Sequence, residues 1–418
     1  MRTSPQRPRD CHFLTHVQKM AAAGGDLSEM TSSIQIRVRK NPVRRLLSIV
    51  RAPFRAFFRR MMNRNRYAVV MWTLLSPLVS TSLYALIRLG VIEHLKDGPK
   101  SAKDLAAAAM ACEQSLYRVL RALASIGFLK QRKDGNFELT PLSKMLLKDH
   151  PASLQGMALL YGDVSVPNLT SFVDSIRTGR SIIDLSHDKT VWEFLAEHPA
   201  TAESFDRQMN QWTALQAATV VATYDFSSAR TIVDVGGGRG AMMREILSAQ
   251  PQARGVILDR PEVVGQTQRH LEEAGLGDRC TCVGGDFFES VPEGADVYII
   301  KHVLHDWDDE HAEKILRNIR QAMGPMSRLL IVEGLVEHNY SSGEFFRAWW
   351  DVLQLSHTLG RARTLDQMQA MLDRCGFRLV SLTPTSIADV LILEADPVAV
   401  DALDPSHARK YSAAAEPV

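Results

Sequence analysis

The sequence predicts an α/β fold, in which a seven-stranded Rossmann-like sheet follows an N-terminal, mostly helical winged-helix domain. Three observations predict this fold. The apolar, β-branched run at 231–235 breaks into four glycines within five residues and then into a helical pattern. From Arg230 onward, strand-like and helix-like segments alternate. Before residue 160, a helix–turn–helix pattern is followed by two short strand-like runs around Asp134-Gly135.

In the C-terminal half, seven apolar runs predict one mostly parallel sheet with one antiparallel strand at the end. Helices are expected between the runs, except that the last two should form a hairpin around Pro384-Thr385. The expected strands span 231–235, 254–258, 280–284, 295–301, 328–333, 377–383 and 387–394.

The winged-helix pattern has the element order of DNA-binding modules, but its charges argue against nucleic acid. The expected second helix, Glu113–Ile126, carries only Arg118 and Arg121 as cations. DNA binding requires cations that neutralise phosphates. We therefore expect a protein–protein role for this module and no nucleic-acid partner.

The segment before the winged helix is strongly basic. Between Met30 and Ile92 there are twelve Lys and Arg residues and no Asp or Glu. Apolar residues at 43–62 recur at helical spacing with arginines on the other face, which is typical of a basic amphipathic helix. Two interpretations stay open: an arm that packs on a partner subunit, or an arm that contacts an anionic membrane surface.

Residues 67–87 carry no charge and are long enough to span a bilayer. Their hydroxyl side chains make them polar for that role. We expect instead a pair of buried helices broken at Pro77.

Five segments are expected along the chain. They are a disordered and basic arm (1–66), the winged-helix domain (67–160), a helical connector that contributes to the substrate pocket (161–228), the catalytic domain (229–397) and a loose tail (398–418). The first 30 residues lack the apolar core of a signal peptide, and the five scattered cysteines are interpreted as reduced thiols. Both features favour the cytoplasm, with peripheral membrane contact through 43–62 left open.

The glycine turn predicts a nucleotide-like cofactor at the carboxyl edge of the sheet. Glycines without a Cβ let a ligand approach the backbone at a strand-to-helix turn. Asp259 ends the second strand, where an acid accepts hydrogen bonds from ribose hydroxyls. These features alone do not separate NAD from S-adenosylmethionine.

Two further features favour S-adenosylmethionine. The turn reads Gly-Gly-Gly-Arg-Gly from Gly236, which departs from the dinucleotide spacing G-x-G-x-x-G. After the third strand comes Asp286-Phe287, an acid for the exocyclic amine of adenine and a ring for its face.

Together these motifs resemble the class I S-adenosylmethionine-dependent methyltransferases. More narrowly, the chain resembles the small-molecule O-methyltransferases, which include plant caffeate and flavonoid enzymes, animal acetylserotonin enzymes and bacterial pigment and antibiotic tailoring enzymes. The resemblance covers roughly residues 68–395. It rests on four motifs in order: Asp234-Val235-Gly236-Gly237-Gly238-Arg239-Gly240, Leu258-Asp259-Arg260-Pro261, Gly284-Gly285-Asp286-Phe287-Phe288 and Lys301-His302-Val303-Leu304-His305-Asp306-Trp307.

The resemblance implies a homodimer, a winged-helix dimerisation domain, a metal-independent reaction and a set of cofactor contacts. The glycine turn, with Gly236 and Gly238, would hold the methionine part. Asp259 would bind ribose. The implied adenosine contacts are Asp286, Phe287 and Lys301.

Transfer of a methyl group to a phenolic oxygen needs a base with a pKa near neutrality, and histidine fits. His302 and His305 both follow the fourth strand. In the family the histidine of the His-Asp-Trp triplet is the base, which implies His305. Glu333 ends the fifth strand at the same edge and would fix the imidazole tautomer.

The acceptor itself cannot be identified from the sequence beyond an aromatic or lipophilic hydroxyl compound. Asp306 is expected to touch it, and the pocket is expected to draw on residues near Met209 and Trp349.

The chain departs from the family at Ala362, because many members carry Glu at the matching position of a Gly-x-Glu-Arg-Thr stretch. His305 would then be polarised from one side only. This departure leaves open a hydroxylase or decarboxylase that uses the same fold and cofactor. A separate alternative is a non-enzymatic winged-helix regulator that senses the cofactor.

Overall fold

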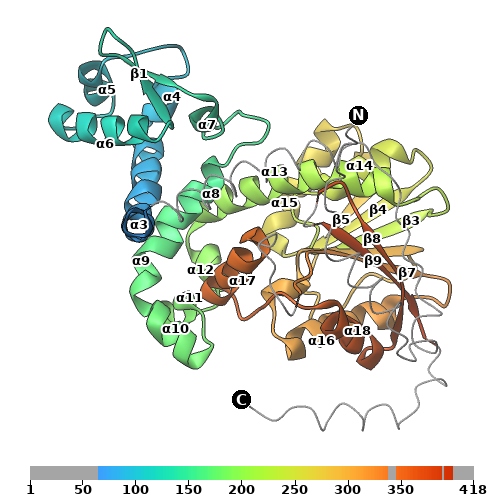
Figure 1. The fold of residues 1–418 in the computed structure, drawn as a ribbon. Coiled ribbons are helices and arrows are strands. Elements are labelled where there is room, and N and C mark those ends of the chain that lie inside the picture. Colours follow the sequence, from blue (N-terminus) through green and yellow to red (C-terminus); the bar gives the residue numbers. More distant parts are fainter. Residues whose placement is uncertain (1–64, 338–344, 388–389, 399–418) are drawn as a thin grey trace, which may run out of the picture.

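The computed structural model describes residues 65–337, 345–387 and 390–398 (Figure 1). The basic arm at 43–62, the rest of residues 1–64 and the tail after 398 lie outside the described residues. Figure 1 shows a small helical domain joined through a helical connector to a large domain with a central sheet.

The N-terminal domain is a helical module with a short hairpin. Ser101 caps the helix that starts at Ala102, because its side chain accepts a hydrogen bond from the Asp104 amide at 3.1 Å. The hairpin strands pair antiparallel, as expected. The elements are α3 (Arg66–Arg88), α4 (Val91–His94), α5 (Ala102–Ala108), α6 (Glu113–Ser125), β1 (Leu129–Gln131), β2 (Phe137–Leu139) and α7 (Pro141–Lys144).

The expectation of two buried helices broken at Pro77 was wrong. Helix α3 is one continuous helix through Pro77, and only Leu86 and Ile87 of its residues are buried. Pro77 has no amide to donate to the Thr73 carbonyl, but the Ser76 hydroxyl donates to that oxygen at 2.7 Å instead. The lost backbone bond is thus replaced locally, and the helix does not need to break.

The connector wraps beside the large domain and ends in a long helix. Its core is formed by Val164, Ile182, Ile183, Phe194 and Leu195. Its elements are α8 (Gln155–Leu160), a π-helical turn (Tyr161–Ser165), α9 (Val166–Asn168), a 3₁₀ turn (Leu169–Ser171), α10 (Phe172–Thr178), α11 (Ile182–His187), α12 (Val191–Glu197) and α13 (Pro199–Thr223).

The large domain contains the expected seven-stranded sheet, in the order β5-β4-β3-β6-β7-β9-β8. Strand β9 is antiparallel to both of its neighbours, while the first five strands of this order are parallel. Strand β9, the last strand in the described residues, is therefore inserted between β7 and β8. The strands are β3 (Thr231–Val235), β4 (Arg254–Asp259), β5 (Cys280–Gly284), β6 (Val297–Lys301), β7 (Arg328–Glu333), β8 (Phe377–Pro384) and β9 (Leu391–Pro397).

Helices cover both faces of this sheet and form two separate hydrophobic cores. One core contains α16 and α18, and the other contains α13 and α14. The remaining elements of the domain are α14 (Ala241–Ala249), α15 (Pro261–Glu273), 3₁₀ turns at Gly277–Arg279 and Leu304–Asp306, α16 (Asp309–Ala322), α17 (Phe345–His357) and α18 (Leu365–Arg374).

The strand order places the candidate site. Strand β3 pairs with β4 on one side and with β6 on the other. In an open parallel sheet, the crevice beyond the carboxyl ends of such strands is where ligands bind. The glycine turn, Asp259 and the segment after Lys301 all follow the carboxyl ends of these strands.

Candidate active site

The glycine turn after β3 leaves open space at Gly238. Gly236 and Gly238 have φ values of 71° and 56°, in the left-handed region that favours glycine. A Cβ on Gly236 would lie 2.8 Å from Val303 Cγ2, whereas a Cβ on Gly238 would meet nothing within 4 Å. One oxygen of the buried Asp234 carboxylate has no hydrogen-bond partner among the described residues. Open backbone beside an unsatisfied buried oxygen fits a polar ligand at this turn.

Asp259 is fixed beside the turn by two backbone amides. Its Oδ2 accepts from the Gly238 amide at 2.7 Å and its Oδ1 from the Arg260 amide at 2.8 Å. Burial raises the pKa of this carboxyl, and the two amides oppose that shift. Each carboxylate oxygen can accept a further hydrogen bond, so the geometry fits a ligand with two adjacent hydroxyls.

The segment after β5 brings an aromatic ring to the same edge. Asp286 is exposed, and its Oδ1 accepts from the Phe288 amide at 2.8 Å. The Phe287 ring lies close to the glycine turn, because a Cβ on Gly236 would be 3.7 Å from its Cε1. Phe287 also contacts Trp307 edge-on, with ring centroids 6.3 Å apart. The edge therefore offers a carboxylate and apolar ring surface side by side.

Lys301 ends β6 with a largely desolvated amine. Its Nζ donates to Thr213 Oγ1 on α13 at 3.2 Å. Burial lowers the pKa of Lys301 to about 8, while burial raises the pKa of Asp234 to about 7. The attraction between these two groups opposes both shifts. Lys301 is thus held in the site, and not on the exposed surface.

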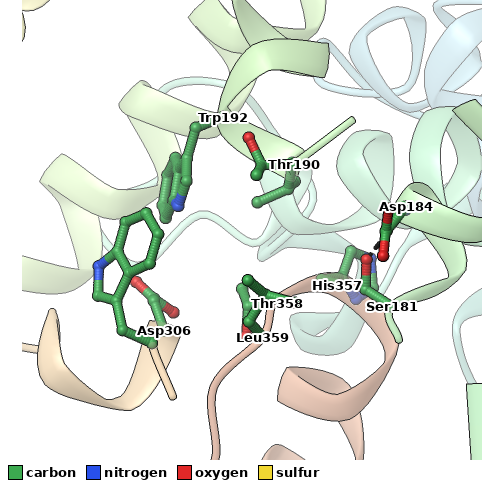
Figure 2. Close-up of a pocket in the computed structure, with 10 residues that line it drawn as sticks. Ser181, Asp184, Thr190, Trp192, Asp306, His357, Thr358 and Leu359 are labelled. Carbon is green, nitrogen blue, oxygen red and sulfur yellow. Dashed lines mark hydrogen bonds between the residues drawn. The ribbon is translucent and has the colours of Figure 1, made fainter. Parts of the chain in front are cut away.

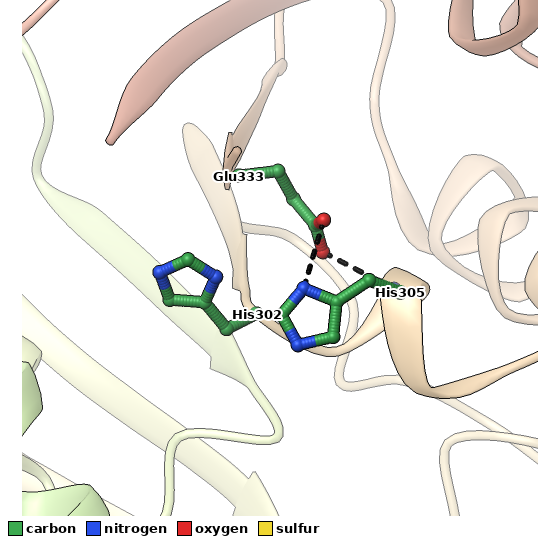
Figure 3. Close-up of side chains that lie close together, drawn as sticks. All are labelled: His302, His305 and Glu333. Carbon is green, nitrogen blue, oxygen red and sulfur yellow. Dashed lines mark hydrogen bonds and ion pairs between the residues drawn. The ribbon is translucent and has the colours of Figure 1, made fainter. Parts of the chain in front are cut away.

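His305 and Glu333 lie next to each other, as their positions after neighbouring parallel strands predict (Figure 3). His305 lies in the 3₁₀ turn after β6, and its Nδ1 is 3.2 Å from Glu333 Oε2 at the end of β7. The His305 amide also donates to Glu333 Oε1 at 3.3 Å. Both side chains are buried, with 8% and 3% exposure. The carboxylate therefore fixes both the backbone and the ring of His305.

The charge environment of His305 suits a proton acceptor. Burial alone would lower the pKa of His305, but the charges of Glu333 and Asp306 and the hydrogen bond to Glu333 outweigh burial and raise it. Asp306 Oδ1 lies 3.6 Å from His305 Nε2. Burial raises the pKa of Asp306 itself to about 6. The Nε2 atom thus remains the one that can face an acceptor, with a second carboxyl beside it.

A small cavity opens next to Asp306 (Figure 2). Its volume is about 110 Å³, which is room for about one aromatic ring. Figure 2 shows Trp192 and Asp306 on one side and His357 with Ser181 on the other. The lining residues are Ser181, Asp184, Thr190, Val191, Trp192, Asp306, Trp307, His357, Thr358 and Leu359.

Two expected substrate residues are not among those that line this cavity. Met209 is half-buried on α13. Trp349 on α17 is 60% exposed. The next residue, Trp350, instead lies beside the candidate base, with its ring centroid 6.5 Å from that of His305. The helical pattern of α17 could not decide which of two adjacent tryptophans turns inward.

Sequence reasoning missed two residues that hold the His305 turn. Arg363 is 2% exposed and donates to the carbonyl oxygens of Leu304 and Trp307 at 2.7 and 2.8 Å, and to Asp309 Oδ1 at 3.0 Å. Gly360 packs so closely that a Cβ there would lie 2.0 Å from the His305 carbonyl oxygen. Both residues fall in the Gly-Arg-Ala-Arg-Thr stretch, and no local pattern in this stretch indicates that they contact the His305 turn.

Ala362 places no carboxylate beside His305. Its amide donates to Asp351 Oδ1 at 2.7 Å, which secures the backbone of this stretch. The acids that influence His305 are Glu333 at Nδ1 and Asp306 near Nε2. The imidazole is therefore hydrogen-bonded by a carboxylate on its Nδ1 side, with a second acid near its Nε2 atom.

Comparison with known proteins identifies the family. An O-methyltransferase domain matches residues 170–378, and an O-methyltransferase dimerisation domain matches residues 72–149. The chain is 37% identical over 320 residues to a phenazine O-methyltransferase of Lysobacter antibioticus, covering 77% of this chain and 93% of that protein.

Two further relatives bear on the reaction. The structure of a mitomycin 7-O-methyltransferase superposes with a TM-score of 0.75 at 36% identity, covering 83% of this chain and all of the other. An aclacinomycin 10-hydroxylase of Streptomyces purpurascens is 33% identical over 297 residues, covering 70% of this chain and 79% of that protein.

Solved structures of family relatives contain S-adenosylmethionine. The open glycine turn and the fixed Asp259 carboxylate fit that group. The chain belongs to the S-adenosylmethionine-dependent small-molecule O-methyltransferases, and it carries the dimerisation domain of that family.

Proposed function

We propose that His305 is the general base of this O-methyltransferase and that its Nε2 removes the proton of the acceptor hydroxyl. The observation that carries the proposal is the 3.2 Å contact between His305 Nδ1 and Glu333 Oε2. This contact places the ring proton on Nδ1 and leaves the lone pair on Nε2. The carboxylate also stabilises the imidazolium that forms when Nε2 takes the proton.

The cofactor, when bound, supplies a methyl group on a sulfonium, whose carbon–sulfur bond breaks as the carbon–oxygen bond forms. Gly236 and Gly238 would hold its methionine part and Asp259 its ribose. The adenine would lie against Phe287, with Asp286 beside its amine and Lys301 near the adenosine. These residues would bind and orient the cofactor, while His305 accepts the proton.

We further propose that the acceptor is a flat aromatic compound that enters beside Asp306. The cavity is bounded by Trp192 and Trp307, whose ring centroids are 6.4 Å apart with the planes inclined by 30°. Aromatic walls favour a planar ligand. The names of the phenazine and mitomycin relatives agree with this class.

His305→Ala tests this function directly. Turnover of a phenol that the wild type methylates should fall by roughly 100-fold or more, because the variant lacks the imidazole that accepts the proton. The affinity for S-adenosylhomocysteine, measured by calorimetry, should stay near the wild-type value. Methyl transfer is followed with labelled S-adenosylmethionine and a panel of phenols, quinols and polyene alcohols. Turnover near the wild-type level in this variant would remove the base assignment.

The hydroxylase alternative is favoured by one relative at 33% identity. The buried His305–Glu333 contact favours methyl transfer, because it prepares a proton acceptor. The same labelled incubation decides between them: formation of a hydroxylated or decarboxylated product without a transferred label would establish the alternative.

We propose that α3 forms part of the homodimer interface. It is the one helix in the described residues that is long and apolar enough to cross a membrane, and only 11% of its apolar window is buried. The dimerisation domain match at 72–149 includes most of this helix. A partner subunit would cover this apolar surface, and we propose a cytoplasmic homodimer that binds no nucleic acid. Liposome flotation with and without residues 1–66 tests whether the basic arm instead contacts a membrane.

A further inference from the structure

His302 is a partly buried residue, with both ring nitrogens buried, for which the proposed reaction has no role. It follows β6 and lies next to the candidate base. Neither of its ring nitrogens has a hydrogen-bond partner among the described residues, although both nitrogens are buried. A buried polar atom without a partner is costly, so it is rarely kept unless a ligand satisfies it. His302 therefore points to a polar group that arrives with a ligand.

The backbone holds His302 in a defined place. Its amide donates to the Val332 carbonyl oxygen at 3.1 Å, so the pairing of β6 with β7 reaches this residue. Its φ is 50°, in the left-handed region, which histidine visits more readily than most residues. The strand therefore ends in an uncommon turn that fixes where this imidazole lies.

The two histidines lie close enough to contact one small molecule. Figure 3 shows their rings side by side, and the ring centroids are 5.1 Å apart. A ring nitrogen of His302, one of His305 and a carboxylate oxygen of Glu333 all lie within 4.8 Å of one another.

His302 is neutral in this environment. Burial, followed by the positive charges of Lys301 and His305, holds the pKa of His302 well below its usual value. A neutral imidazole offers one donor and one acceptor. It can therefore pair with either a hydroxyl or a carbonyl oxygen.

We propose that His302 positions the acceptor by binding a second oxygen, on the ring carbon next to the hydroxyl that is methylated. The proposal rests on the proposed function, because it takes His305 as the base for the first oxygen. One ring nitrogen of His302 and one of His305 lie within 4.8 Å of each other. Two oxygens on adjacent ring carbons can therefore each lie about 2.8 Å from one of these nitrogens. The substrate class is an aromatic compound with a vicinal oxygen pair, such as an ortho-diphenol or an ortho-hydroxyquinone.

The same three side chains could in principle hold a cation, but two observations favour the acceptor. The Glu333 carboxylate already accepts a hydrogen bond from the His305 amide and lies 3.2 Å from His305 Nδ1, so both of its oxygens are engaged by His305. The buried amine of Lys301 adds positive charge next to both imidazoles. A bound metal is therefore an outcome that the test must be able to reveal.

The test compares two naphthols that differ by one oxygen. Full-length protein saturated with S-adenosylhomocysteine is titrated calorimetrically with 1,2-dihydroxynaphthalene or 2-naphthol under argon. The wild type should bind the diol about tenfold more tightly, which is the effect of one additional buried hydrogen bond. In His302→Gly, whose backbone accepts the positive φ, this ratio should fall to about one.

The conservative variant His302→Asn keeps a donor and an acceptor and tolerates the same backbone, so it should retain a severalfold preference for the diol. Unchanged affinity for S-adenosylhomocysteine shows that each variant is folded. A merely structural role of His302 would not change the ratio between the two naphthols.

Three results would overturn the proposal. They are equal wild-type affinities for the two naphthols, an unchanged preference in His302→Gly, and a stoichiometric metal ion in the wild type that this variant loses. The readout is binding, so it does not depend on methyl transfer. A diol preference without any methylated product would leave the His302 proposal standing and count against the proposed function alone.

Discussion

The turn that carries His305 and helix α3 differ in how their side chains are covered: those of the turn are largely buried by other segments of the chain, whereas many of those on α3 are exposed. The turn around His305 is held by Glu333 at the end of β7 and by Arg363 from a distant segment of the same chain, and the His305 side chain is 8% exposed. On α3, Val70, Leu74 and Leu78 recur on one face with exposures of 57%, 68% and 64%. One chain thus organises the candidate base by itself, whereas helix α3 presents an exposed apolar face that fits a second chain.

The largest effect on this comparison is expected from Gly360→Ala. The added Cβ would lie 2.0 Å from the His305 carbonyl oxygen and 2.4 Å from the Asp306 carbonyl carbon, so the base turn must shift. We expect turnover to fall by roughly 100-fold, because small misplacements of a catalytic group are costly. Steady-state kinetics measure this, with Gly265→Ala as the control, since a Cβ there meets nothing within 4 Å. Wild-type kinetics in Gly360→Ala would show that the turn need not be held so closely.

The dimer side of the comparison is tested by Leu74→Glu with Leu78→Glu. If this face is buried against a partner, two charges there should raise the dimer dissociation constant by about 100-fold or more. Analytical ultracentrifugation measures the change, with Lys133→Glu in the β1–β2 turn as the charge-matched control. A dimer of undiminished stability would place the interface elsewhere.

A smaller effect is expected from Arg363→Met. The substitution keeps an apolar stem but removes the donors to the Leu304 and Trp307 carbonyl oxygens. We expect about a tenfold loss of turnover, with a smaller change in KM, because the base turn loosens while the cofactor contacts remain. Arg361→Met removes only an exposed contact to Asp309 and is the matched control. Equal kinetics in the two variants would contradict a positioning role for Arg363.

Much of the large domain could be predicted from the sequence because its signals are local. Apolar β-branched runs predict the strands, and the glycine turn after β3 predicts a cofactor at the carboxyl edge of the sheet. The pairing of His305 with Glu333 could also be anticipated, since both follow strands that end at one edge of a parallel sheet. The placement of β9 between β7 and β8 could not be read from the order of the runs, because a hairpin prediction does not say on which side the second strand lies.

The parts that could not be predicted depend on contacts between distant segments. The clamp by Arg363 joins residues more than 50 positions apart, and nothing in its own stretch indicates burial. Pro77 suggested a break, but the neighbouring Ser76 hydroxyl compensates for the missing amide. The exposure of α3 escaped prediction because an apolar helix in a dimer has the composition of a buried one.

The pH dependence of kcat/KM in the wild type and in Glu333→Gln tests the account most directly. His305 must be neutral to accept a proton, so kcat/KM should fall on the acidic side, below the pKa of His305, which Glu333 helps to raise above its usual value. Removing the Glu333 charge should lower that pKa and move the acidic limb to lower pH, while maximal turnover drops. Asp306→Asn separates the contribution of Asp306, whose pKa is about 6. An acidic limb that stays in place or moves to higher pH in Glu333→Gln would contradict the pairing of these two residues in catalysis.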